Sequence, residues 1–106
     1  MEAAKDQTGS RFIQDKIVDA DAATVAVIFD EIQPTAIDLM KDVFANYIVQ
    51  LLIQEGTPDQ QRQVLNMMEG RVVELSLNKF SCRVIQTLIE VLDSSDLSPI
   101  VQELAS

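Results

Sequence analysis

The sequence predicts an all-α protein in which three-helix repeats of 36 residues stack into an α-solenoid. The first observation is a five-residue motif that recurs at a fixed interval: SRFIQ at 10–14, NYIVQ at 46–50 and CRVIQ at 82–86, where 46 − 10 and 82 − 46 both equal 36. The second is that apolar residues recur in the same register, and the third is that no segment alternates as a strand would. Repeats of this size bury their apolar sides against one another.

The repeats divide the chain into four parts of one partial repeat domain. Residues 21–56 and 57–92 are expected to be complete repeats, whereas 1–20 holds only the third helix of a repeat and 93–106 only the first helix of another. Laying one complete copy over the other pairs apolar with apolar residues although identities are few, as a shared buried face requires. The pairs are Ile28 with Val64, Phe29 with Leu65, Ile32 with Met68, Ala36 with Val72, Ile37 with Val73, Ile48 with Val84 and Val49 with Ile85. In the last part of the chain, Ile100 and Val101 lie one further period after Val64 and Leu65.

Three helices are expected in each complete copy because apolar residues recur there at intervals of three and four. Pro34 and Gly70 lie in the same column of the overlay, one period apart, and mark the passage from the first helix to the second. Thr57 and Ser98 are predicted N-caps, since each precedes a proline and proline suits the first helical position. The stripes of the first complete copy are Ile28, Phe29 and Ile32, then Ile37 and Met40, then Phe44, Ile48, Leu51 and Leu52.

Composition excludes several classes of site. The 106 residues include one cysteine and no histidine, so we expect no disulfide framework, no zinc site and no cofactor. A hydrophobic content of 47% is enough for a real core. The longest uncharged run, from Val43 to Gln54, is too short to cross a bilayer, and the charged start lacks the apolar run of a signal peptide. We therefore expect a soluble cytoplasmic protein without a membrane partner.

The net charge of −9 is unusual for a protein that binds nucleic acid, because affinity for phosphates normally comes from lysine and arginine. The distribution of charge is more informative than its sum. Most basic residues fall in or just before the three motifs, whereas most acidic residues lie elsewhere, which favours one less negative face on an acidic body. The basic residues near the motifs are Lys5, Arg11, Lys16, Lys41, Lys79 and Arg83.

The motifs have the composition of a site for a planar, hydrogen-bonding ligand. In a helix the first and fifth motif residues lie on one face with the second beside them, as Asn46, Gln50 and Tyr47 would. A flat side chain next to a short polar group and an amide can stack on a nucleobase and bond to its edge.

The plainer alternative is that these polar residues simply face solvent. Three motifs at one interval favour a site, since the flanking surface positions Asp15, Leu51 and Thr87 vary freely while the glutamine recurs. The third and fourth motif residues are expected to turn toward the core; these are Phe12 and Ile13, Ile48 and Val49, and Val84 and Ile85.

Over essentially its whole length the sequence resembles the Pumilio (PUF) family of RNA-binding repeat proteins. The stretches DQTGSRFIQ, DVFANYIVQ and NKFSCRVIQ are similar to that family's first three repeats. The resemblance implies a curved right-handed superhelix of Pumilio-type repeats whose concave face is lined by the motif helices. It also implies binding of single-stranded RNA, not DNA, at one base per repeat in messenger RNA 3′-UTR elements, for post-transcriptional regulation such as translational repression.

The family's recognition pattern implies a base for each motif. Serine or cysteine with arginine and glutamine selects adenine, and asparagine with tyrosine and glutamine selects uracil. The N-terminal repeat takes the 3′ base, so the implied triplet is 5′-AUA-3′. Glutamine can both donate and accept, so the short and flat residues must supply the discrimination. The implied base-edge contacts are Ser10, Gln14, Asn46, Gln50, Cys82 and Gln86, and the implied stacking residues are Arg11, Tyr47 and Arg83.

The chain departs from the family pattern in two respects. Family members commonly carry lysine after the motif glutamine, and its replacement here by Asp15, Leu51 and Thr87 is expected to weaken phosphate attraction. The family's domain has eight repeats, whereas this sequence has three motifs. Neither end resembles the capping unit that a solenoid requires, so the exposed apolar ends are expected to favour head-to-tail self-association. For Cys82 alone, a small buried hydrophobe is the alternative to a base-reading role.

Two other classes of function compete with RNA binding. A protein-binding scaffold of HEAT or armadillo type would suit the acidic surface, but its repeats are longer and lack the recurring motif. An enzyme is not expected, because the sequence has no histidine, no glycine-rich phosphate loop and no paired carboxylates at a plausible cleft.

Overall fold

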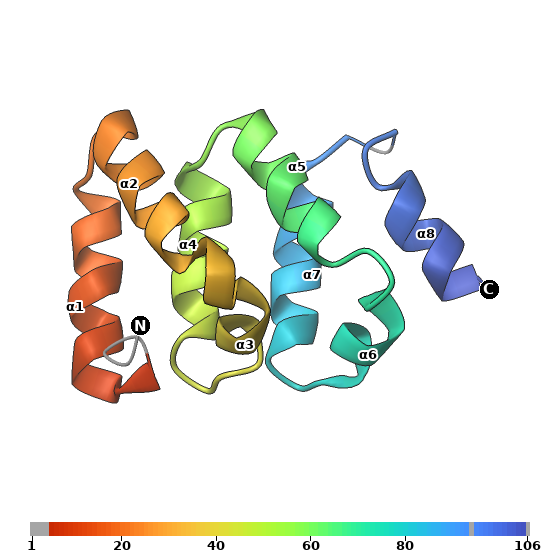
Figure 1. The fold of residues 1–106 in the computed structure, drawn as a ribbon, viewed down its shortest axis with the longest axis horizontal. Helices are drawn as coiled ribbons and strands as arrows, with labels where there is room; N and C mark the ends of the chain where they lie inside the picture. Colours follow the sequence, from red (N-terminus) through yellow and green to blue (C-terminus); the bar gives the residue numbers. More distant parts are fainter. Residues whose placement is uncertain (1–4, 94, 106) are drawn as a thin grey trace.

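The computed structural model describes residues 5–93 and 95–105, and the regular structure within these ranges is entirely helical (Figure 1). The molecule is elongated, with extents of 39 × 25 × 21 Å. No helix in the described part of the chain is long and apolar enough to cross a membrane. In chain order the elements are α1 (Gln7–Val18), α2 (Ala22–Ile32), the 3₁₀ helix η2 (Gln33–Thr35), α3 (Ala36–Met40), α4 (Asn46–Glu55), α5 (Pro58–Met67), α6 (Val72–Leu77), α7 (Ser81–Val91) and α8 (Ser98–Ala105).

The helices stack as a solenoid. α1, α4 and α7 stand side by side in one row, and α2, α5 and α8 lean across the molecule in a second row (Figure 1). The short helices α3 and α6 connect the rows and pack on α4 and α7 respectively. Each of the ranges 21–56 and 57–92 contains three α-helices, α2–α3–α4 and α5–α6–α7, and the predicted fold class is confirmed.

Local sequence signals set the helix boundaries. Thr57 caps α5 in a reciprocal arrangement: its Oγ1 accepts a hydrogen bond from the backbone N–H of Gln60 at 3.2 Å, and Gln60 Oε1 accepts one from the N–H of Thr57 at 2.9 Å. Gly70 follows α5 with φ of +79°, a left-handed conformation that glycine adopts without strain. The predicted cap at Ser98 is one residue off, because Ser98 is itself the first residue of α8.

One continuous hydrophobic core runs through the solenoid, and it follows most of the predicted apolar columns. Val73 and Val101 were expected on the buried face, but they are 49% and 60% exposed. The prediction for Phe12 was wrong. Its side chain is 62% exposed, whereas Ile48 and Val84, one and two periods later, are fully buried. Within the described residues no helices cover α1 in the way that α2 and α3 cover α4, so this column lies open on α1.

Polar contacts between the copies follow the same period. Lys5 forms an ion pair with Asp38, and Lys41 forms the equivalent pair with Glu74. Both residues of the second pair lie 36 positions after those of the first. The Glu103 carboxylate of α8 accepts hydrogen bonds from the backbone N–H groups of Gly70 at 2.9 Å and Val72 at 3.2 Å. This contact ties α8 to the start of α6.

Candidate nucleic-acid interface

The three motifs lie on the three adjacent helices α1, α4 and α7, at or within one turn of the residue where each helix begins. Their flat side chains, Arg11, Tyr47 and Arg83, are all exposed. Arg11 and Tyr47 line one pocket and Arg83 contacts Tyr47, so a guanidinium, a phenol and a second guanidinium follow one another along the row of helices.

In the first motif, the Ser10 side chain is buried and its hydroxyl both donates and accepts a hydrogen bond. Ser10 Oγ donates to the carbonyl of Phe44 at 3.0 Å and accepts from Gln14 Nε2 at 2.9 Å. Ser10 thus joins α1 to the loop before α4 and holds one end of the Gln14 amide. Gln14 is half-buried and lies between Ser10 and solvent.

In the second motif, Asn46 has the same place but a different set of partners. Its Nδ2 donates to the carbonyls of Asp42 at 2.8 Å and Val43 at 3.1 Å, and its Oδ1 accepts from Gln50 Nε2 at 2.9 Å. Because both Nδ2 hydrogens go to loop carbonyls, Oδ1 must face the glutamine. The buried asparagine therefore sets the orientation of the Gln50 amide.

The third motif is more open. Cys82 is partly exposed and its Sγ lies 3.3 Å from the carbonyl of Lys79, so it is not a core side chain. Gln86 is exposed. A different residue, Ser81, takes the fully buried place at the start of α7 and donates from Oγ to the carbonyl of Leu75 at 2.6 Å.

Two hydrogen bonds link the second motif to α7. Arg83 Nη1 donates to the phenol oxygen of Tyr47 at 2.7 Å. Thr87 Oγ1 lies 3.3 Å from Gln50 Oε1. The first motif has no such link from its guanidinium in the described contacts; Arg11 instead pairs with Asp15 of its own helix, with Nε 3.6 Å from Oδ1.

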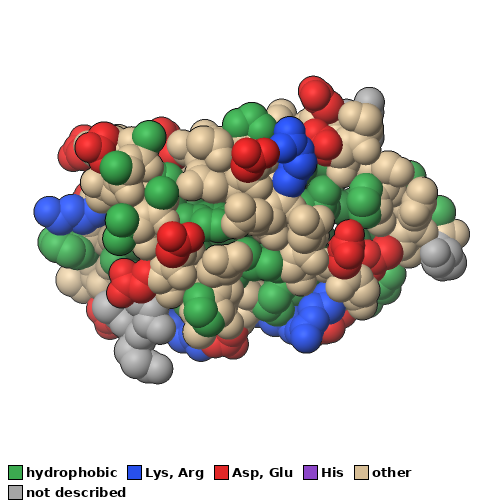
Figure 2. Space-filling view, turned by 45° about the horizontal axis from the view of Figure 1, so that its top comes forward, with side chains coloured by type: hydrophobic (Ala, Val, Ile, Leu, Met, Phe, Trp, Pro, Cys, Tyr) green, Lys and Arg blue, Asp and Glu red, His purple; other side chains and the backbone are tan. Residues whose placement is uncertain are grey.

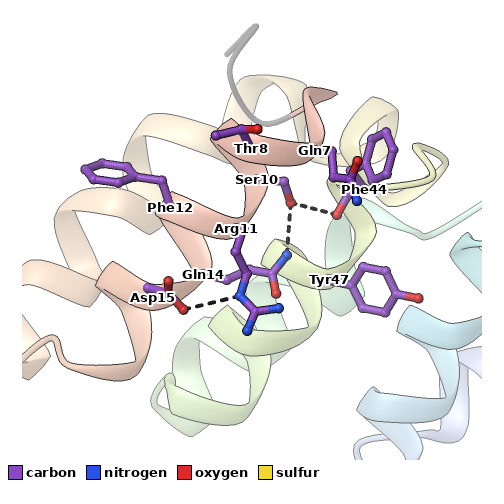
Figure 3. A pocket seen from close by; sticks show the side chains of 9 residues that line it. All are labelled: Gln7, Thr8, Ser10, Arg11, Phe12, Gln14, Asp15, Phe44 and Tyr47. Carbon is purple, nitrogen blue, oxygen red and sulfur yellow. Dashed lines mark hydrogen bonds and ion pairs between the residues drawn. The ribbon is translucent and has the colours of Figure 1, made fainter.

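An open cleft of about 700 Å³ lies between α1 and α4. Figure 3 shows Arg11 and Gln14 of α1 on one side and Tyr47 of α4 on the other, while the ring of Phe12 points away. The structure thus brings the first motif and the flat residue of the second into one cavity. Cys82, Arg83 and Gln86 are not part of its lining, which consists of Gln7, Thr8, Ser10, Arg11, Phe12, Gln14, Asp15, Phe44 and Tyr47.

Sequence reasoning missed two residues of this surface. Thr87 was expected to be a freely varying surface position, and this was wrong, since it is only 4% exposed. Phe44 was assigned only to an apolar stripe, yet it also lines the cleft and its carbonyl accepts from Ser10. The identity of Phe44 and Phe80 across one period was the available signal for this position.

The electrostatics of the surface are mixed. On the face shown in Figure 2, basic side chains lie at separate points among acidic ones. The ammonium groups of Lys5 and Lys41 are used in ion pairs, and that of Lys16 lies 5.3 Å from the centre of the Phe12 ring. Lysine hydrogen bonds, followed by the lysine charges, hold the pKa of Asp38 and of Glu74 below their ordinary values.

Comparison with known proteins identifies the repeats. Residues 2–33, 36–68 and 71–105 each match the family model described as "Pumilio-family RNA binding repeat". These matches start 36 − 2 = 34 and 71 − 36 = 35 residues apart, and the second begins at the short helix α3. The family unit is thus offset by one helix from the copies at 21–56 and 57–92, and that division of the chain stays a prediction.

Two curated relatives show the extent of the similarity. Pumilio homolog 1 of Xenopus laevis is 39% identical over 106 residues, which is 98% of this chain and 9% of the relative. Pumilio homolog 11 of Arabidopsis thaliana is 33% identical over 102 residues, or 93% of this chain and 18% of the relative. The chain therefore spans less than a fifth of the length of either protein.

Solved structures agree with the sequence matches. The Puf3 RNA binding domain bound to a Cox17 RNA 3′ UTR recognition sequence is 40% identical, with a TM-score of 0.93 over 99% of this chain and 31% of that one. The Puf4 RNA binding domain bound to an HO endonuclease RNA 3′ UTR recognition sequence is 32% identical, with a TM-score of 0.87 over 96% of this chain and 32% of that one. None of these matches is to a HEAT or armadillo scaffold. The chain belongs to the Pumilio family of RNA-binding repeat proteins.

Proposed function

We propose that the chain binds single-stranded RNA sequence-specifically at one base per repeat and reads 5′-AUA-3′ in the 3′-UTR of messenger RNAs. The role that follows is cytoplasmic post-transcriptional regulation, with translational repression as its outcome. Membership of a family of RNA-binding repeats supports RNA as the partner. The 3′ UTR sequences bound by Puf3 and Puf4 support messenger RNA as its source.

The observation that carries this proposal is the cleft between α1 and α4, with Arg11 on one side and Tyr47 on the other. A planar base between a guanidinium and a phenol ring gains stacking on both faces. The Gln14 amide beside them supplies a group for the base edge. The same combination recurs one period later with Tyr47, Gln50 and Arg83.

The edge contacts follow from the hydrogen bonds already present. Gln14 and Gln50 each donate one Nε2 hydrogen to the short residue behind them, which leaves a second Nε2 hydrogen and lone pairs on Oε1 for a base. Adenine and uracil each present a donor next to an acceptor on their pairing edges, so this arrangement suits both. The expected base-edge contacts of Ser10 and Asn46 stay a prediction; both side chains are buried in the unbound chain, and each also holds the glutamine amide beside it.

The third base is assigned to the partly exposed Cys82 and the exposed Gln86, with Arg83 stacking on it. If each stacked base contributes about 1–3 kcal/mol, three contribute about 3–9 kcal/mol before the cost of ordering the strand, roughly 4 kcal/mol or more. Binding by this chain alone is therefore expected at micromolar or weaker dissociation constants.

The test is to exchange the specificity of the second motif with the double variant Asn46→Ser and Tyr47→Arg. Serine has a backbone acceptor available by analogy, because the Phe80 carbonyl is the equivalent, one period later, of the Phe44 carbonyl that Ser10 uses. Binding of short RNAs containing AUA or AAA is measured by fluorescence anisotropy. We expect the wild type to prefer AUA and the double variant to prefer AAA.

The controls are a scrambled RNA and a titration with salt. Wild-type binding is expected to disappear with the scrambled sequence and to weaken only modestly with salt, since few lysines are available for phosphates. Equal binding of the wild type to AUA and to scrambled RNA, or an unchanged base preference in the double variant, contradicts the proposal. A protein-binding scaffold would give the first of these results.

A further inference from the structure

Thr87 is the buried polar side chain of α7 that lies closest to the second motif, and it is not itself a motif residue. Its Oγ1 lies 3.3 Å from Gln50 Oε1 and 3.0 Å from the Arg83 carbonyl of its own helix. Both oxygens lie within hydrogen-bond distance, so the single hydroxyl hydrogen can be donated to either of them. The hydroxyl thus contacts the end of the Gln50 amide that Asn46 does not hold.

The Gln50 amide is consequently held at both ends. At one end Nε2 donates to Asn46 Oδ1, which faces it because both Asn46 Nδ2 hydrogens are given to loop carbonyls. At the other end Oε1 accepts from Thr87. Reversing the amide would bring Oε1 against Asn46 Oδ1, two acceptors in contact, whereas the Thr87 hydroxyl could accept from the reversed Nε2. Asn46 therefore sets the orientation of the amide, and the contact with Thr87 restrains its position.

The first motif provides an internal comparison. Leu51 occupies the position one period before Thr87 and has no hydroxyl, so Gln14 is held only by Ser10 in the described contacts. Gln50 is thus contacted by a hydroxyl of the following repeat, whereas Gln14 is not in the described contacts. Arg83, one turn before Thr87 on α7, also bonds Tyr47, so one face of α7 positions two residues of the second motif.

We infer that Thr87 is a positioning residue that sharpens recognition of the middle base by fixing the Gln50 amide across the repeat boundary. This inference rests on the proposed RNA-binding function. Uracil presents an N–H to Gln50 Oε1, whereas cytosine presents an acceptor nitrogen there and its donor at the neighbouring amino group. With the base in the same position, cytosine would place an acceptor against Oε1, and reversing the amide would set Oε1 against Asn46 Oδ1. The contact with Thr87 limits the movement of the amide that would otherwise relieve this repulsion.

The test compares Thr87→Val, which keeps the shape and removes the hydroxyl, with Thr87→Ser, which restores it. The dissociation constants for short RNAs containing AUA and ACA are measured for each protein. We expect Thr87→Val to reduce the preference for uracil over cytosine by about 2- to 10-fold, the range of one ordinary hydrogen bond, and Thr87→Ser to recover it. Leu51→Thr is the converse variant and should sharpen discrimination at the adenine read by Gln14.

A measurement without RNA accompanies the binding data. The side-chain amide of Gln50 is followed by ¹⁵N relaxation, and Thr87→Val should increase its mobility while Thr87→Ser should not. Urea denaturation confirms that the variants remain folded. A wild type that does not distinguish AUA from scrambled RNA overturns the proposed function and this inference with it. A wild type that distinguishes them, combined with an unchanged uracil-to-cytosine ratio in Thr87→Val, overturns this inference alone.

Discussion

Arg83 and Tyr47, 36 residues apart in sequence, are joined by a hydrogen bond of 2.7 Å from the guanidinium Nη1 to the phenol oxygen. The bond connects the flat side chains of the second and third motifs across the boundary between two copies. It fixes the outer edge of the tyrosine ring relative to α7, because Tyr47 is otherwise exposed. The stacking surface of the second motif is thus partly assembled by the third.

Replacing Tyr47 separates the role of the ring from that of its hydroxyl. Tyr47→Phe keeps the ring and loses the bond to Arg83, so we expect affinity for AUA-containing RNA to fall by no more than about 3-fold. Tyr47→Ala removes the stacking surface, worth about 1–3 kcal/mol, and should lower affinity by roughly 5- to 150-fold. Fluorescence anisotropy measures both. Similar losses in the two variants would indicate that the hydroxyl, and not the ring, is the important group.

The periodic ion pairs predict a pH dependence of stability. Lys41 lowers the pKa of Glu74 in the folded protein below its ordinary value of 4.5, by its hydrogen bond first and its charge second. A depressed folded pKa means that the stabilisation is present above the unfolded pKa and is lost as pH falls through the folded one. The difference in unfolding free energy between the wild type and Lys41→Met should therefore be present at pH 7 and shrink below pH 4.5.

Lys16→Met is the matched control for the ion pair, because the Lys16 ammonium lies over the Phe12 ring rather than beside a carboxylate. Urea denaturation over a range of pH gives the comparison, and added salt should reduce the effect of Lys41→Met at neutral pH. A difference between wild type and Lys41→Met that stays constant down to strongly acidic pH would mean that lost packing of the lysine chain, and not its charge, is responsible.

The left-handed turn at Gly70 predicts that a substitution lowers the stability of the fold only through backbone conformation. A Cβ there would meet no atom within 4 Å, so Gly70→Ala is expected to destabilise the fold only through its φ of +79°, by about 1–2 kcal/mol. Gly70→Asn should cost less, because asparagine tolerates this region better than alanine. Urea denaturation midpoints provide the measurement. Equal stability of Gly70→Ala and wild type would show that the turn changes its conformation at little cost.

The open apolar columns at the two ends of the solenoid predict head-to-tail self-association of this 106-residue chain. Phe12 is 62% exposed on α1, and Val101 is 60% exposed on α8 although its equivalents Phe29 and Leu65 are 3% and 4% exposed. Within the described residues, neither position is covered as its equivalents in the interior are. We expect α8 of one copy to cover α1 of the next as α2 covers α4, a heterologous contact detectable by analytical ultracentrifugation at high concentration.

Complementation between variants tests this arrangement. Phe12→Asp blocks one end and Val101→Asp the other, so each variant alone should be monomeric, whereas their mixture should form a one-to-one dimer through the two intact ends. Val27→Asp, at a 65% exposed apolar position on α2, is the control and should associate like the wild type. A wild type that sediments as a monomer at high concentration would rule out the association.

The sequence by itself determined that the chain forms helical repeats and which residues make up each motif. Columns such as Ile48 with Val84 recur because each repeat buries the same face, so the period could be found without coordinates. The spacing within NYIVQ likewise predicted that Asn46 and Gln50 share a helix face, and the structure joins them by a hydrogen bond of 2.9 Å. These features depend on contacts within one helix or on a pattern repeated in every copy.

Only the tertiary structure decided which groups of the motifs are buried and which residues join one repeat to the next. The burial of Ser10 behind Gln14, the contact of Thr87 with Gln50 and the exposure of Phe12 have no counterpart in helical periodicity. The first two depend on how a segment more than thirty residues away packs against the motif, and the third on the helices that would cover α1. Sequence spacing fixes the face of a helix on which a side chain lies, but the distance to the next repeat is set by the packing of the side chains between them.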